Sequence, residues 1–145
     1  MRARGFTLLE LMVVLVIGAL AYTVILGVPL RGASTADLKA AARTLAAGLR
    51  QAQTTAMATR RDATLVLDLE SRQFEVSGVQ GARELPRDIE LKLFTDQKEA
   101  ISEKKGAIRF YPDGSSTGGR ITVASGERKF LVDVDWITGR VSIGD

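Results

Sequence analysis

Two short patterns in this sequence have the residue types of enzyme active sites. Gly114-Ser115-Ser116-Thr117-Gly118 fits the G-x-S-x-G pattern of a nucleophile elbow, in which a strand leads into the serine and a helix follows it. Here the next residues, Arg120-Ile121-Thr122-Val123, have the composition of a strand, and the chain has no histidine to activate Ser116. Ser102-Glu103-Lys104-Lys105 matches S-x-x-K, but it lies in a charged connection without the partner motifs of penicillin-binding proteins. We therefore expect no enzyme activity.

The composition also argues against a metal ion or a cofactor. The chain has no His and no Cys, which removes Ser-His-Asp and Cys-His catalysis and most zinc sites. Asp133 and Asp135 alternate with valines and should point away from the core, where they could offer oxygens to calcium. The remaining ligands are not evident, so no metal site is expected. Gly114 and Gly119 have the outer spacing of a phosphate-binding loop, but Arg120 replaces its lysine, so no cofactor is expected either.

Glu10 is the strongest candidate for a functional carboxylate in this sequence. It is the one charged residue between Arg4 and Arg31, and it precedes the uncharged run from Leu11 to Leu30. Twenty helical residues rise about 30 Å, the thickness of the hydrocarbon core of a bilayer. A carboxylate at the edge of such a span is costly to bury unless it finds a partner. The run is therefore predicted to span a membrane, with Glu10 as its functional residue.

This opening resembles the type IV prepilin signature, which pilins share with the pseudopilins of type II secretion. The matching residues are Gly5, the run Phe6-Thr7-Leu8-Leu9-Glu10-Leu11 and the apolar segment behind it. The resemblance implies that a prepilin peptidase cleaves between Gly5 and Phe6 and then methylates the new amino terminus of Phe6. It also implies that Glu10 pairs with the positive amino terminus of a neighbouring subunit during assembly.

Two other interpretations of this segment are open. A general secretory signal would end at an A-x-A-like site such as Ala19-Leu20-Ala21, but the apolar run continues for nine residues beyond it and Glu10 would lie inside the apolar region. A plain single-pass anchor would leave Glu10 reaching toward the headgroups. The basic residues on the two sides of the span do not decide its orientation. The resemblance implies an inner-membrane protein with a cytoplasmic amino terminus and a periplasmic carboxy-terminal domain.

A second helix is predicted behind the apolar span. Ser34 is a candidate N-cap, and Asp37 follows it near the positive end of the helix dipole. Apolar residues then recur at steps of three or four on one narrow stripe, which is typical of a helix packed on a sheet. The stripe consists of Leu38, Ala42, Leu45, Leu49, Ala52 and Ala56. Basic residues on its flank are expected to form a solvated face.

From Ala63 onward the apolar residues follow the two-residue period of strands. Seven segments are predicted to be strands, and most of them alternate apolar and polar residues, as half-buried antiparallel strands do. They are residues 64–68, 73–77, 89–93, 108–111, 120–123, 130–134 and 140–143. Two polar connections, 78–87 and 96–106, separate some of them. These connections are expected to contact partners, because loops on a rigid scaffold carry recognition.

The predicted fold is α+β and type IV pilin-like, with one long amino-terminal helix packed on antiparallel sheets. Its predicted divisions are a leader (1–5), a transmembrane helix (6–30), an amphipathic helix (31–61) and a periplasmic β domain (62–145). The 20 Lys+Arg and 17 Asp+Glu residues are interspersed, so no arm for nucleic acid is evident. Without Cys, an extracytoplasmic domain must be held together by packing.

Two blocks in the carboxy-terminal half narrow the resemblance to minor pseudopilin H of type II secretion and its relatives, the FimT-like minor pilins. The matching residues are Asp113, Gly114, Ser115, Thr117, Gly118 and Gly119, followed by Thr138, Gly139 and Arg140. The resemblance implies a subunit at the pseudopilus tip that helps prime assembly and promotes export of folded proteins. Its implied partners are the other minor pseudopilins, the major pseudopilin, and secreted substrates or the outer-membrane channel.

The alternative is a FimT-like minor pilin that takes part in pilus assembly and DNA uptake. DNA-binding relatives carry Gly-Arg-x-Arg near the carboxy terminus, whereas this chain has Gly139-Arg140-Val141-Ser142. The second arginine is missing and the charge is nearly balanced, so no phosphate-neutralising surface is evident. We therefore do not expect DNA to be a partner.

Overall fold

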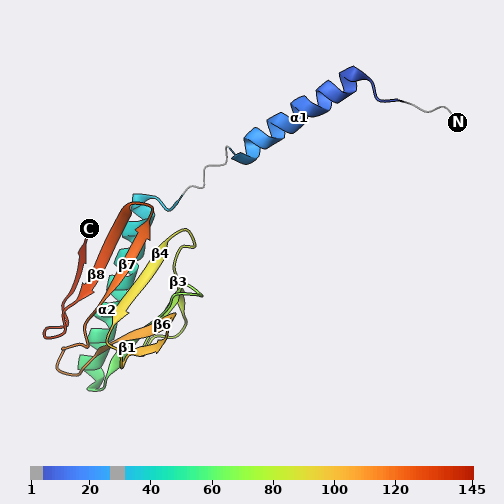
Figure 1. The fold of residues 1–145 in the computed structure, drawn as a ribbon. Helices are drawn as coiled ribbons and strands as arrows, with labels where there is room; N and C mark the ends of the chain where they lie inside the picture. The colour runs from blue at the N-terminus through green and yellow to red at the C-terminus, as the bar shows by residue number, and fades with distance from the viewer. Residues whose placement is uncertain (1–4, 27–31) are drawn as a thin grey trace. The chain divides into compact units, whose positions relative to one another are not determined.

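The computed structural model describes residues 5–26 and 32–145. The chain divides into two units, Met1–Arg31 and Gly32–Asp145. The first unit holds helix α1 (Leu8–Leu26), drawn in blue in Figure 1. Within the described ranges, no helix reaches the length and apolarity of a membrane span. The last residues of the predicted span, 27–30, lie outside these ranges, as does most of the predicted leader.

The second unit begins with helix α2 (Thr35–Thr59). Ser34 is its N-cap, as predicted: the Ser34 Oγ accepts from the Asp37 N–H at 3.1 Å, and the Asp37 carboxylate accepts from the Ser34 N–H at 3.0 Å. This reciprocal pair is a capping box. The helix ends at Arg60, whose backbone is left-handed. The predicted range 31–61 is therefore shortened at both ends by its caps.

Nine strands follow α2 in residues 60–145. They are β1 (Ala63–Asp68), β2 (Gln73–Val76), β3 (Arg83–Glu84), β4 (Glu90–Thr95), β5 (Ala100–Ser102), β6 (Lys105–Phe110), β7 (Gly119–Ser125), β8 (Arg128–Val134) and β9 (Val141–Gly144). All seven predicted strands are present, with bounds shifted by a few residues. The short strands β3 and β5 were missed, and they lie in the two connections that were expected to be loops.

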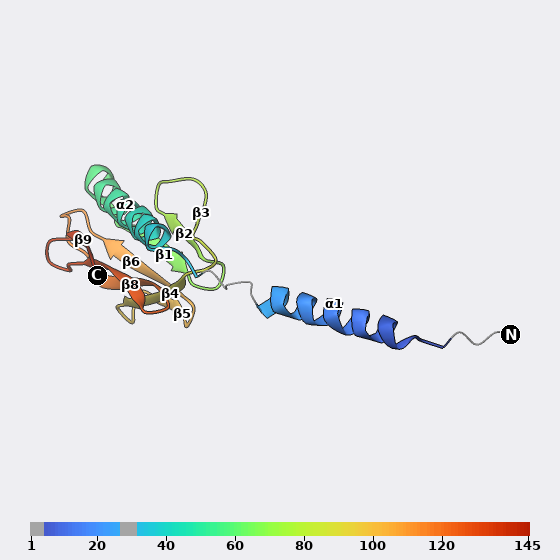
Figure 2. The ribbon, with the colours of Figure 1, turned by 90° about the horizontal axis from the view of Figure 1, so that it is seen from above.

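The strands form two antiparallel sheets. The first sheet has the order β3-β2-β1-β6-β5, and the second has the order β4-β7-β8-β9. Helix α2 packs against both sheets, and Figures 1 and 2 show it lying along them. The α+β architecture predicted from sequence, with a helix packed on antiparallel sheets, is confirmed for residues 32–145.

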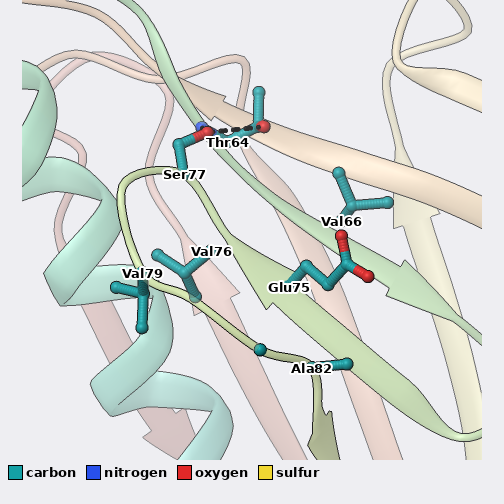
Figure 3. Close-up of a pocket in the computed structure, with 8 residues that line it drawn as sticks. Thr64, Val66, Glu75, Val76, Ser77, Val79 and Ala82 are labelled. Atoms are coloured by element: carbon teal, nitrogen blue, oxygen red, sulfur yellow. Dashed lines mark hydrogen bonds between the residues drawn. The ribbon is translucent and has the colours of Figure 1, made fainter.

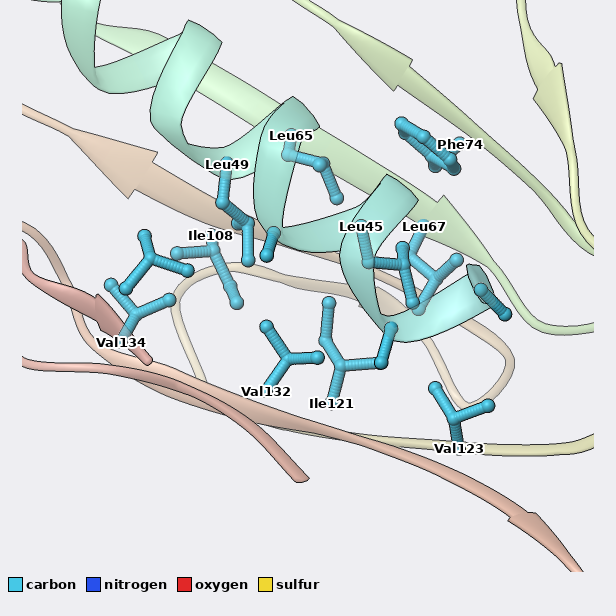
Figure 4. Close-up of a cluster of buried hydrophobic side chains, with 14 of the residues drawn as sticks. Leu45, Leu49, Leu65, Leu67, Phe74, Ile108, Ile121, Val123, Val132 and Val134 are labelled. Atoms are coloured by element: carbon cyan, nitrogen blue, oxygen red, sulfur yellow. The ribbon is translucent and has the colours of Figure 1, made fainter. Parts of the chain in front are cut away.

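The core lies where the inner faces of the two sheets meet α2 (Figure 4). Leu45 and Leu49 enter it from the helix, and the strands contribute the labelled side chains of Leu65, Leu67, Phe74, Ile108, Ile121, Val123, Val132 and Val134. All six residues of the predicted stripe are buried, and Ala41, Ala46 and Gly48 are buried beside them. The buried face is wider than predicted because α2 contacts two sheets rather than one.

Candidate functional site

The first candidate site is the start of α1. The Thr7 carbonyl oxygen accepts from the Leu11 N–H at 3.1 Å, and the Thr7 Oγ1 accepts from the Glu10 N–H at 3.2 Å. Thr7 is therefore the N-cap of α1, and Glu10 lies in the first turn, near the positive end of the helix dipole. This cap was missed from sequence, although Thr-x-x-Glu has the capping-box spacing that would have revealed it.

Gly5 and Phe6, the predicted cleavage pair, precede this cap and are accessible. Phe6 is 80% exposed. A Cβ added at Gly5 would meet no atom within 4 Å, so packing against the described residues does not explain the glycine. Across residues 5–26 and 32–145, the Glu10 carboxylate makes no hydrogen bond or salt bridge. The structure thus brings Gly5, Phe6 and Glu10 together in one exposed segment.

The second candidate site contains the carboxy-terminal motif residues. They lie in two loops, residues 111–118 after β6 and 135–140 after β8, except for Gly119, which begins β7. Gln53 of α2 joins these loops, because its Nε2 donates to the Gly114 carbonyl at 2.9 Å and to the Thr138 carbonyl at 3.3 Å. A Cβ on Gly139 would overlap the Gly114 carbonyl oxygen, so the loops approach too closely for any other residue there. The two motif blocks are therefore one structural unit.

Aspartates shape both loops. Asp113 Oδ1 accepts from the Ser115 Oγ at 2.6 Å and the Ser115 N–H at 3.0 Å. Asp135 Oδ1 accepts from the N–H groups of Ile137 and Thr138, at 2.9 and 2.8 Å. The hydrogen bond from the Ser115 side chain lowers the pKa of Asp113, and the one from the Thr138 backbone lowers the pKa of Asp135. Both carboxylates thus hold turns in shape.

The remaining chemical candidates also have structural roles. Ser116 is buried, its Oγ accepts from the Gly118 N–H at 3.0 Å, and strand β7 rather than a helix follows it. Asp133 pairs with Arg120 on the outer face of the second sheet. In the part of the chain that the structure describes, no group of three or more His, Cys, Asp or Glu residues could hold a metal ion.

The two polar connections are anchored to the domain. In residues 78–87, Val79 packs against the core and lines a hollow of about 320 Å³ together with Thr64 and Ser77, whose hydroxyls lie 3.1 Å apart (Figure 3). In residues 96–106, Glu99 accepts from Arg109 at 2.8 and 3.2 Å, and these bonds raise the pKa of Arg109. Whether either connection contacts a partner stays a prediction.

Comparison with known proteins identifies the family. The profile of the family described as type II transport protein GspH matches residues 41–139, and that of the prokaryotic N-terminal methylation motif matches residues 1–26. Type II secretion system protein H of Xanthomonas campestris pv. campestris is 36% identical over 142 residues, which cover 97% of this chain and 83% of that protein. The chain belongs to the GspH family. The resemblance drawn from the prepilin opening and the two motif blocks is thereby confirmed.

Two solved structures share the fold of this GspH-family chain. The minor pseudopilin EpsH of the type 2 secretion system of Vibrio cholerae has a TM-score of 0.57 at 11% identity and covers 74% of this chain and 95% of its own. The type IV minor pilin FimU of Pseudomonas aeruginosa has a TM-score of 0.56 at 15% identity and covers 74% and 88%. These likenesses show the fold alone. The family match makes the chain a minor pseudopilin, a membrane-anchored subunit that assembles with other pseudopilins.

Proposed function

We propose that this GspH-family subunit crosses the inner membrane once, with its amino terminus in the cytoplasm and residues 62–145 in the periplasm. The uncharged run from Leu11 to Leu30 supports the span. A prepilin peptidase cleaves between Gly5 and Phe6 and methylates the Phe6 amine. The accessible position of both residues, and the lack of a packing reason for Gly5, support this assignment.

Glu10 is the assembly residue. The observation that carries this proposal is that Thr7 caps α1, while the Glu10 carboxylate makes no hydrogen bond or salt bridge among the residues described. A carboxylate held in apolar surroundings needs a cation to offset its desolvation. The methylated amine of Phe6 in a neighbouring subunit supplies that cation. Their pairing sets the register between adjacent helices as the filament grows.

The periplasmic domain has a structural role at the pseudopilus tip. It helps to prime assembly with the other minor pseudopilins and the major pseudopilin, and it promotes export of folded proteins. The connections 78–87 and 96–106 contact secreted proteins or the outer-membrane channel. The domain carries out no catalysis, which agrees with the structural use of Ser116, Asp113 and Asp135.

A deletion strain scored for two phenotypes tests this function. We expect release of exported proteins to be lost and DNA uptake to be unchanged, with release restored by the full chain supplied in trans. Loss of uptake with normal release would instead favour the FimT-like alternative. In that case a salt-dependent DNA-binding assay of the full chain in detergent, with Arg140→Ala as the variant, would locate the DNA contact.

A further inference from the structure

Two exposed aromatic side chains flank one hollow beside the motif loops. Phe94, at the end of β4, is 77% exposed, and Trp136, just after β8, is 66% exposed. Both line a hollow of about 450 Å³. Large apolar side chains that are exposed together commonly mark an interaction site. Tryptophan is also one of the residues that contribute most binding energy at protein interfaces.

The motif pair Gly118-Gly119 also lines this hollow. Both glycines have positive φ, at 74° and 154°. A Cβ on Gly118 would lie 3.0 Å from the Trp136 Cβ, and one on Gly119 would lie 2.8 Å from the Phe94 carbonyl oxygen. The backbone of Trp136 is also fixed, because its carbonyl accepts from the Ser116 N–H at 3.0 Å. The two rings therefore project from backbone that is already held in place before any partner arrives.

The charge of the lining is negative. Asp96 is the charged residue among those that line the hollow, and its Oδ1 accepts from the Lys98 N–H at 3.0 Å, which fixes the carboxylate at the rim. Arg120 lies next to Phe94 in the sheet, but its guanidinium binds Asp133. Aromatic faces attract cations, and a guanidinium also stacks on rings and pairs with carboxylates.

We propose that the hollow binds an arginine side chain of a neighbouring pseudopilin. Its guanidinium stacks against Phe94 and Trp136 and meets the Asp96 carboxylate at the rim. This inference rests on the proposed function, because assembly with other pseudopilins is what brings the arginine to the hollow. It also gives Gly118 and Gly119 a role beyond leading the chain into β7.

The fluorescence of Trp136 tests the proposal directly, since the chain has one tryptophan. The full chain in detergent micelles is titrated with acetyl-glycyl-arginyl-glycinamide and with the same peptide carrying citrulline, a neutral isostere of arginine. We expect a saturable change with the arginine peptide and about tenfold weaker binding of the citrulline peptide, as loss of a cation from aromatic faces and a carboxylate implies. A response that rises linearly without saturation, or equal affinity for both peptides, would overturn the proposal.

Variants of the lining residues locate the site. Phe94→Leu and Asp96→Asn should each weaken binding of the arginine peptide several-fold, and both should unfold at the wild-type temperature because the two side chains are exposed. Lys98→Ala is the matched control and should bind normally. Unchanged binding by both lining variants would place the peptide elsewhere and reject the hollow.

The same variants separate this proposal from the proposed function. If the deletion strain loses protein release but Phe94→Leu and Asp96→Asn bind and secrete normally, the hollow is not the arginine site and the subunit role stands. If the deletion strain secretes normally while the arginine peptide still binds at the hollow, the subunit role fails and the binding site remains.

Discussion

The two helices of this chain begin with the same kind of sequence but use its acidic residue differently. In α2, the Asp37 carboxylate accepts from the Ser34 N–H at 3.0 Å and from the Ser34 hydroxyl at 2.7 Å, which closes the capping box. In α1, Thr7 Oγ1 accepts from the Glu10 N–H, while the Glu10 carboxylate makes no hydrogen bond or salt bridge within the described ranges. Asp37 completes the cap of its own helix, whereas the Glu10 carboxylate has no such bond to the described part of the chain.

The faces of the two helices differ in the same way. Helix α2 buries one face against two sheets, whereas residues 8–23 of α1 are exposed on every side. Their glycines show the contrast in detail. A Cβ at Gly48 would lie 2.8 Å from the Phe74 ring and 3.0 Å from Leu65, but a Cβ at Gly18 would meet nothing within 4 Å. Helix α2 is packed within its own unit, while the described side chains of α1 are exposed.

Removing the acid of α1 tests the comparison with the largest expected effect. Glu10→Val should leave cleavage between Gly5 and Phe6 intact, because neither residue changes. It should reduce protein release to the level of the deletion strain, because no carboxylate remains to pair with the neighbouring amine. The measurements are mobility of the processed chain and assay of exported protein. Glu10→Asp, which keeps the charge, is the control, and normal assembly of Glu10→Val would contradict the role given to Glu10.

Truncating one leucine in each helix separates folding from assembly. Leu45→Ala should lower the free energy of unfolding of residues 32–145 by about 2–5 kcal/mol, because Leu45 is fully buried. Leu15→Ala should change that free energy by less than about 0.5 kcal/mol, because Leu15 is 65% exposed. Denaturant unfolding of the full chain in detergent, followed by circular dichroism, measures both. Similar losses from the two substitutions would mean that α1 stabilises the domain.

Substitution of Gly48 in α2 and Gly18 in α1 should give a smaller difference in the free energy of unfolding. Gly48→Ala gains about 1 kcal/mol of helix propensity but overpacks the buried Phe74 ring at a cost of about 1–3 kcal/mol, so we expect a net loss near 1 kcal/mol. Gly18→Ala should leave the domain unchanged, because the added methyl has open space around it. The same unfolding measurement applies. Stabilisation by Gly48→Ala would show that α2 can move away from the first sheet.

Periodicity predicted most of the fold, and contacts between distant residues account for what it missed. The stripe of α2 and the seven longer strands follow from apolar spacing alone. Strands β3 and β5 have two and three residues, all exposed, so they carry no period. They form because the edges of β2 and β6 offer hydrogen bonds. The buried face of α2 is wide because the helix contacts two sheets. The spacing of apolar residues within the helix does not predict how many sheets it contacts.

The two candidate sites also differ in whether neighbouring or distant residues in the sequence form them. Gly5, Phe6 and Glu10 came from a short local signature, and the methylation-motif match covers them. The joining of Gly114 to Thr138 by Gln53 could not be predicted, because those partners lie 61 and 85 residues away from it. Thr7 differs from Gln53, because the residues that form its cap are only three positions apart in the sequence. The Thr-x-x-Glu spacing could therefore have predicted this cap, which was missed.

The closed capping box of α2 predicts an effect of similar size to that of Gly48→Ala, but one that depends on pH. The hydrogen bond from the Ser34 side chain lowers the pKa of Asp37 in the folded state. Because the folded pKa lies below the unfolded one, this stabilisation is present above the unfolded pKa of about 4 and is lost as the pH falls through the folded pKa. Because Ser34 is the N-cap of α2, Ser34→Ala should destabilise residues 32–145 at pH 7 by the usual cost of losing an N-cap, about 1 kcal/mol. The difference in free energy of unfolding between the wild type and Ser34→Ala should become smaller in acid, as measured by unfolding at pH 7 and below pH ~3.

The control is Thr44→Ala, because the Thr44 Oγ1 donates to the Ala40 carbonyl within α2 and involves no carboxylate. Its effect on the free energy of unfolding should not become smaller in acid. A Ser34→Ala difference that is constant with pH would mean that the Asp37 carboxylate does not stabilise the start of α2.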